Sequence, residues 1–171
     1  MLDTMDGVTA GVTLRDPRYR PSSKAPLVWA LSAAIPWAVV LIGLAIWLVL
    51  DTRLLWLQIC LLAVAAVCAV VSVGVAPIWR YRVHRWEISA QAVLTRTGWL
   101  IQERRIAPIS RVQTVDTYRG PLDRLFGLAN VTVTTASSAG AVRIVALDSA
   151  VADDIAAYLT DIAAIGGSDA T

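Results

Sequence analysis

One histidine and two cysteines are the side chains of this sequence whose types most often serve catalysis or metal binding. His84 stands near no recognisable nucleophile or orienting carboxylate motif. Cys60 and Cys68 are eight residues apart, which matches neither a redox pair nor a zinc-ligand spacing. The sequence also has no glycine-rich phosphate loop. It therefore predicts a non-enzymatic protein with no cofactor and no metal site, in which His84 is structural or incidental.

Arginine side chains offer a different chemistry, because a guanidinium binds carboxylates and phosphates through paired hydrogen bonds. Arg104 and Arg105 are adjacent. They are either contacts for an anionic ligand or partner, or a solvated strand end. Arg111, Gln113 and Arg124 lie around a turn. They form either a local hydrogen-bond or ion-pair network that holds this turn, or a ligand or partner site.

Charge is distributed unevenly along the chain, whose net charge is +2. Residues 80–124 contain nine arginines and four acidic residues, whereas residues 125–171 contain one arginine and five acidic residues. The first of these arginines, Arg80, Arg82 and Arg85, are predicted to anchor the chain at a membrane surface, since each basic side chain near anionic lipid is worth about 1 kcal/mol. Nucleic acid is not predicted as a partner, because the domain is nearly neutral overall and no recognition helix is apparent.

Two apolar stretches must position these residues. Hydrophobic residues make up 57% of the chain, and they concentrate in residues 27–50 and 54–79, which contain no charged side chain. Each stretch exceeds the roughly 20 apolar residues that cross a bilayer as a helix. Only Asp51, Thr52 and Arg53 separate them. The sequence therefore predicts a transmembrane helical hairpin over residues 27–79.

The basic residues also predict the orientation of the hairpin. Lysine and arginine are retained on the cytoplasmic side of a membrane. Arg53 is alone in the turn, whereas seven basic residues flank the hairpin on the side of the chain ends: Arg15, Arg18, Arg20, Lys24, Arg80, Arg82 and Arg85. Both termini are thus expected in the cytoplasm, with the protein in the plasma membrane. Residues 1–26 are expected to be a largely flexible segment whose basic end lies against anionic headgroups.

Residues 80–165 have the pattern of a strand-rich domain. Apolar and β-branched runs bounded by turn residues predict strands over residues 81–89, 92–97, 99–106, 112–118, 131–135 and 142–147. Val151, Ile155, Leu159 and Ile162 then recur at helical spacing. The fold class is α+β with a membrane part, in which a small barrel or sandwich is closed by a C-terminal helix. Residues 166–171 are expected to be a flexible tail.

One short helical turn is predicted within this domain. Gly120 and Pro121 begin a turn, and Gly127 ends it. Between them, Leu125 and Phe126 are expected to point into the barrel. Asp123 and Arg124 are expected to stay outside.

Three motifs resemble the YdbS-type family of bacterial pleckstrin-homology (PH) membrane proteins. They are RIAPISRVQTVD at residues 105–116, GPLDRLFG at residues 120–127 and VTVTTA at residues 131–136. That family has paired membrane helices followed by such a domain, and the order matches over residues 29–162. The resemblance implies a PH-like split barrel capped by a helix, and it does not imply a ligand.

Two functions are compatible with these features. The first is a non-enzymatic interaction or scaffolding module at the cytoplasmic face of the membrane, whose partners are copies of itself or other PH-like membrane proteins. The second is a subunit that binds or presents membrane lipid in an envelope-stress or transport complex. Tethering to the membrane favours both functions, because it raises the effective concentration of any partner in the same membrane.

Overall fold

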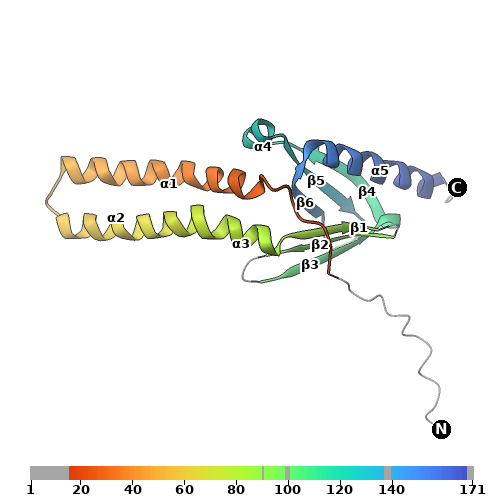
Figure 1. The fold of residues 1–171 in the computed structure, drawn as a ribbon, viewed down its shortest axis with the longest axis horizontal. Helices are drawn as coiled ribbons and strands as arrows, with labels where there is room; N and C mark the ends of the chain where they lie inside the picture. The colour runs from red at the N-terminus through yellow and green to blue at the C-terminus, as the bar shows by residue number, and fades with distance from the viewer. Residues whose placement is uncertain (1–15, 90, 99–100, 137–139, 169–171) are drawn as a thin grey trace, which may run out of the picture.

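The computed structural model describes residues 16–89, 91–98, 101–136 and 140–168. Two long antiparallel helices extend from a β-rich domain (Figure 1). The first helix is α1 (Ala25–Leu50). The second is continuous over Leu55–Val83 and consists of α2 (Leu55–Val70), the π-helical turn η1 (Val71–Val75) and α3 (Ala76–Val83). The expected helical hairpin is therefore present.

Both helices are long enough to cross a membrane. At 1.5 Å per residue they measure about 39 and 44 Å, against about 30 Å of hydrocarbon. Their most apolar windows have mean hydropathies of 2.5 and 2.8, and only 0% and 6% of those windows is buried within the protein. A soluble protein rarely leaves so much contiguous apolar surface exposed. These side chains accordingly face lipid or another membrane protein.

The end of the second helix differs from the prediction. Residues 81–83 were expected to begin a strand, but they complete α3, because the His84 N–H still donates to the Arg80 carbonyl at 2.9 Å. The first strand then begins only one residue later, at Arg85.

The domain contains two antiparallel three-stranded sheets. The first has the order β1-β2-β3, formed by β1 (Arg85–Ile88), β2 (Ala92–Thr97) and β3 (Glu103–Pro108). A 3-10 turn, η2 (Ile109–Arg111), leads to the second sheet. This sheet has the order β4-β5-β6, formed by β4 (Val112–Tyr118), β5 (Leu128–Thr135) and β6 (Val142–Asp148). The predicted strand at residues 99–106 is displaced to Glu103–Pro108, and Trp99 and Leu100 lie outside the described residues.

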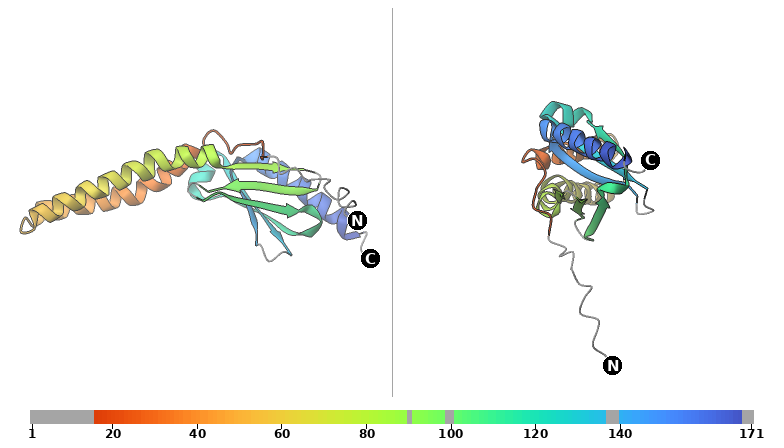
Figure 2. Two further views of the ribbon diagram at one scale, coloured as in Figure 1. Left: turned by 90° about the horizontal axis from the view of Figure 1, so that it is seen from below. Right: turned by 90° about the vertical axis from the view of Figure 1, so that its right-hand side faces the viewer.

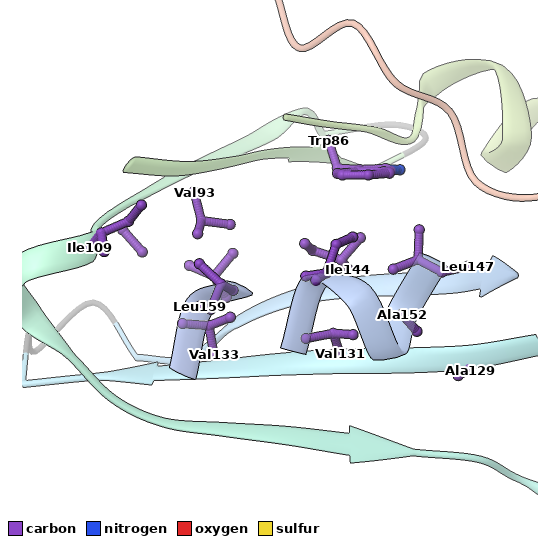
Figure 3. Close-up of a cluster of buried hydrophobic side chains, with 13 residues drawn as sticks. Trp86, Val93, Ile109, Ala129, Val131, Val133, Ile144, Leu147, Ala152 and Leu159 are labelled. Atoms are coloured by element: carbon purple, nitrogen blue, oxygen red, sulfur yellow. The ribbon is translucent and has the colours of Figure 1, made fainter. Parts of the chain in front are cut away.

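The C-terminal helix α5 (Ser149–Ser168) packs across the second sheet (Figures 1 and 2). It extends over residues 166–168, which were expected to belong to a flexible tail, whereas residues 169–171 lie outside the described part. Side chains from both sheets and from α5 form one core, in which Leu159 lies between Val93 and Val133 (Figure 3). β5 alternates buried and half-buried residues because successive side chains of a strand point to opposite faces. The split barrel closed by a helix is confirmed.

A second apolar cluster joins the hairpin to the domain. Ala25 and Val28 at the start of α1 are buried against Leu128 of β5 and Ala146 of β6. Trp29, Tyr81, Leu122 and Phe126 pack around this cluster. The domain is therefore attached to both helices, through packing with α1 and through the chain itself at α3.

Residues 16–24 differ from the expectation of a flexible segment, whereas residues 1–15 lie outside the described part. Tyr19 and Trp86 exchange two backbone hydrogen bonds, at 3.0 and 2.9 Å, which adds a one-residue bridge to β1. The Ser22 N–H donates to the Ala146 carbonyl at 2.8 Å, and its hydroxyl donates to Asp148 at 2.8 Å. These partners are distant in sequence, so no local pattern reveals them.

The short helix α4 (Pro121–Phe126) corrects two further expectations. Leu125 is 75% exposed instead of pointing into the barrel, and Phe126 packs against the cluster that joins the hairpin to the domain. Asp123 is half-buried, because its carboxylate accepts hydrogen bonds from the Gly120 N–H at 3.0 Å and the Asn130 side chain at 2.8 Å. Arg124 is exposed as predicted.

Candidate functional site

Three arginines lie in one row across the membrane-proximal end of the first sheet. Arg85 of β1 is opposite Arg96 of β2, which is opposite Arg104 of β3. We call Arg85, Arg96 and Arg104 the arginine row. Like charges in such positions repel one another and destabilise a sheet. The row therefore requires negative charge from outside the sheet.

Asp16 supplies that charge. Its two carboxylate oxygens bind Arg96 at 2.8 Å and Arg104 at 2.9 Å. One carboxylate thus binds two of the three arginines. Burial, followed by the positive charges of Arg20 and Arg96, lowers the pKa of the Arg85 guanidinium below its usual value. The row keeps an excess of positive charge next to the end of α3.

Arg104 and Arg105 bind different carboxylates, although both residues line a pocket of about 220 Å³. Adjacent strand residues point to opposite faces. Arg104 joins the arginine row, whereas Arg105 binds Glu103 at 2.6 Å and donates to the Ala141 carbonyl at 3.0 Å. Arg105 lines a pocket of about 380 Å³ between the two sheets, with Thr95, Thr97, Glu103, Ala141 and Arg143. Each arginine therefore faces different partners.

Arg111, Gln113 and Arg124 are exposed and dispersed over η2, β4 and α4. Among the described residues, no hydrogen bond or ion pair joins their side chains, so the expected local network is not formed by them. Asn130 and Asp123 hold the turn instead, through the 2.8 Å hydrogen bond between their side chains. Sequence reasoning missed Asn130, because its partners come from three different elements.

The three arginines of the predicted membrane anchor lie in different environments. The Arg80 guanidinium lies 4.2 Å from the centre of the Trp29 ring, and Arg20 lies 5.9 Å from that of Tyr81. Such cation–π pairs contribute about 0.5–1 kcal/mol at exposed sites. Arg82 is exposed, whereas Arg85 belongs to the arginine row. The aromatic rings lie where tryptophan and tyrosine are favoured, at the end of the spans.

A second pocket lies at the junction of the hairpin and the domain. We call it the junction pocket; it has a volume of about 390 Å³ and is lined by Ala76, Arg80, His84, Thr97, Gly98, Arg143 and Val145. His84 is only 3% exposed, and its Nε2 atom has no hydrogen-bond partner among the described residues. Burial, reinforced by the charge of Arg80, lowers the pKa of His84 to about 4. The ring is therefore neutral at physiological pH.

Residues 25–163 match the family model described as bacterial PH domain. The chain belongs to this family. It is a membrane protein with a bacterial PH domain, and the YdbS-type resemblance is confirmed.

A curated relative supports the same assignment. UPF0699 transmembrane protein YdbS of Bacillus subtilis (strain 168) is 38% identical over 88 residues, which cover 48% of this chain and 52% of the relative. The match thus spans about half the length of that relative. No solved structure matches the chain significantly.

Removing the charge of Asp16 in this bacterial PH domain is expected to destabilise it. Asp16→Asn leaves Arg96 and Arg104 without their shared carboxylate, so we expect a loss of about 1 kcal/mol in the free energy of unfolding at low salt. High salt should restore most of this loss, because it screens the repulsion between exposed charges. Chemical denaturation of the detergent-solubilised protein at two salt concentrations measures both effects.

Asp153→Asn is the matched control, because Asp153 binds the isolated Arg119 at 2.7 Å. Its loss should be smaller and less dependent on salt. Equal losses and equal salt dependences for the two variants would show that the arginine row creates no special requirement for Asp16.

Proposed function

We propose that this protein is a non-enzymatic, membrane-anchored interaction module. It works at the cytoplasmic face of the plasma membrane, with both termini in the cytoplasm. The observation that carries the proposal is the fixed attachment of the PH domain to the hairpin. α3 ends at Val83 and β1 begins at Arg85, while Ala25 and Val28 of α1 are buried against the domain. A domain held in this way presents the same faces to every protein in its membrane.

Two surfaces support association with a second copy or another PH-like membrane protein. The hairpin exposes apolar side chains along both helices. β4 lies at the edge of its sheet, and Tyr118 at its end is 65% exposed. Edge strands pair readily with a strand of another chain. Arg111, Gln113 and Arg124 are candidate partner contacts, because they are exposed and do not form the expected local network.

Site-directed crosslinking in native membranes tests this function. Cys60 and Cys68 are first replaced by alanine, and Thr117→Cys then places one thiol on β4. We expect a short thiol crosslinker to trap a complex through this position. Asp154→Cys on α5 is the control, and it should remain uncrosslinked. Recovery of only the monomer from both variants would overturn the proposal.

The second candidate is a subunit that binds or presents lipid in an envelope-stress or transport complex. It is favoured by the excess positive charge of the arginine row, which lies beside the end of the second span. Basic side chains near a membrane surface attract anionic lipid. Arg104 and Arg105 remain candidate ligand contacts, now on different faces of β3. Membrane lipids are partners in either case.

A further inference from the structure

We propose that the junction pocket binds one anionic phosphate group, such as that of a lipid headgroup. The inference deepens the lipid-binding candidate and rests on the membrane placement of the hairpin. The junction pocket is distinct from the arginine row, because its lining includes none of Arg85, Arg96 and Arg104.

The charges of the pocket favour an anion. Arg80 comes from α3 and Arg143 from β6, and none of the described residues that line the pocket is a carboxylate. The side chain of Arg143 is exposed and forms no ion pair or hydrogen bond with another described residue, and it also lines the neighbouring pocket that contains Glu103 and Arg105. A guanidinium forms strong, charge-assisted hydrogen bonds with phosphate oxygens. Two such side chains from different elements can bind one anion together, and Arg80 also packs on the Trp29 ring.

The unpartnered Nε2 of His84 is the second, independent observation. A buried polar atom without a hydrogen bond is costly and rare in folded proteins. Because the ring is neutral at physiological pH, it has one N–H, and with that proton on Nε2 it donates to an acceptor in the pocket. A phosphate oxygen meets this requirement and is attracted by Arg80 and Arg143 at the same time. Thr97 adds a hydroxyl to the lining.

The depth of the pocket matches the headgroup layer. The second helix begins at Leu55. If the hydrocarbon core starts there, about 20 residues at 1.5 Å each bring its inner boundary to the beginning of α3. Ala76 and Arg80 then lie among the headgroups. The pocket is therefore at the level at which lipid phosphates are found.

His84 itself provides the test, because it is the only histidine of the chain. The full-length protein, isotope-labelled at histidine, is studied by NMR in uncharged maltoside micelles. Short-chain phosphatidylglycerol, diacylglycerol of equal chain length and inorganic phosphate are added in separate arms. We expect phosphatidylglycerol to shift the ring signals and to raise the titration midpoint of His84, because a nearby anion stabilises the charged ring against the effects of burial and of Arg80. Diacylglycerol should change neither.

A response to inorganic phosphate as well supports the same phosphate chemistry and identifies a free anion as a competent ligand. No response to either phosphate compound overturns the inference. An equal response to diacylglycerol also overturns it, because acyl chains would then account for the effect.

Arg143→Gln supplies a second readout. Loss of one charge-assisted contact should weaken phosphatidylglycerol binding about tenfold. Arg119→Gln is the matched control, since Arg119 is already bound by Asp153, and it should bind lipid as the unaltered protein does. Equal affinities for both variants would contradict a role for Arg143. If the protein crosslinks through β4 but shows no phosphate response, the phosphate inference is wrong and the interaction proposal stands. If the protein responds to phosphate but is recovered only as a monomer, the interaction proposal is wrong and the phosphate inference stands.

Discussion

Trp86→Ala is expected to lower the free energy of unfolding of the domain by about 3–5 kcal/mol, the cost of removing a large buried aromatic side chain. Trp86 is 8% exposed and belongs to the core between the sheets. Its indole Nε1 donates to the Arg20 carbonyl at 3.1 Å, and its ring lies 5.1 Å from that of Tyr19. The substitution thus removes core volume and loosens residues 16–24 together. Chemical denaturation in detergent, followed by near-UV circular dichroism, measures the loss.

Trp86→Phe separates the two contributions. It keeps an aromatic ring in the core but removes the hydrogen bond to Arg20, so its loss should be clearly smaller than that of alanine. Trp56→Ala is the control for tryptophan removal in general, because Trp56 is 70% exposed at the far end of the hairpin. If Trp86→Ala and Trp56→Ala denature at the same denaturant concentration, the core role of Trp86 is wrong.

The large elements of this protein are predictable because their signals are local. Absence of charge over more than 20 residues indicates a membrane span without any knowledge of its surroundings. β5 and β6 are equally clear, since both are rich in β-branched residues. Where strand predictions failed, the error lay at the ends. The run at residues 81–83 is aromatic and branched, yet helical hydrogen bonding continues through it to His84.

The arginine row was not predictable to the same degree. Strand periodicity alone implies that Arg104 and Arg105 face opposite sides. Which residues stand opposite Arg104 depends on where the β2-β3 hairpin turns, because a shift of one residue changes every cross-strand pair. The contribution of Asp16 was even less predictable from the sequence. It is 80 residues from Arg96, and no periodic pattern relates them.

His84 illustrates the difference between residue type and environment. As a lone histidine in sequence it has no catalytic partner, and an incidental role is the simplest interpretation. Its burial at the end of α3, with an unpartnered Nε2 in a pocket that Arg80 and Arg143 also line, depends on the meeting of three elements. The position next to the membrane was predictable, but the pocket was not.

Asn130→Ala is expected to lower the free energy of unfolding by about 2–3 kcal/mol, because it leaves a buried donor without an acceptor. The Asn130 side-chain oxygen accepts the Ala146 N–H at 2.8 Å, and Ala146 is 1% exposed with a φ of 56°. Its side-chain NH₂ donates to Asp123 at 2.8 Å. The Asn130 side chain therefore links β5 to α4 and stabilises an unusual backbone conformation in β6. Thermal unfolding in detergent should show a decrease of roughly 10 to 20 °C.

Two variants distinguish this network from a general effect on β5. Thr132→Ala changes the same face of the strand two residues later. It should cost less than Asn130→Ala, because the Thr132 side chain forms no such hydrogen bonds with the residues that the structure describes. Asn130→Asp keeps an acceptor for Ala146 but places a second carboxylate against Asp123. Since adjacent carboxylates favour the protonated form, this variant should be less destabilised in mild acid than at neutral pH. Equal losses for Asn130→Ala and Thr132→Ala, with no acid recovery for Asn130→Asp, would show that the amide network does not hold these three elements together.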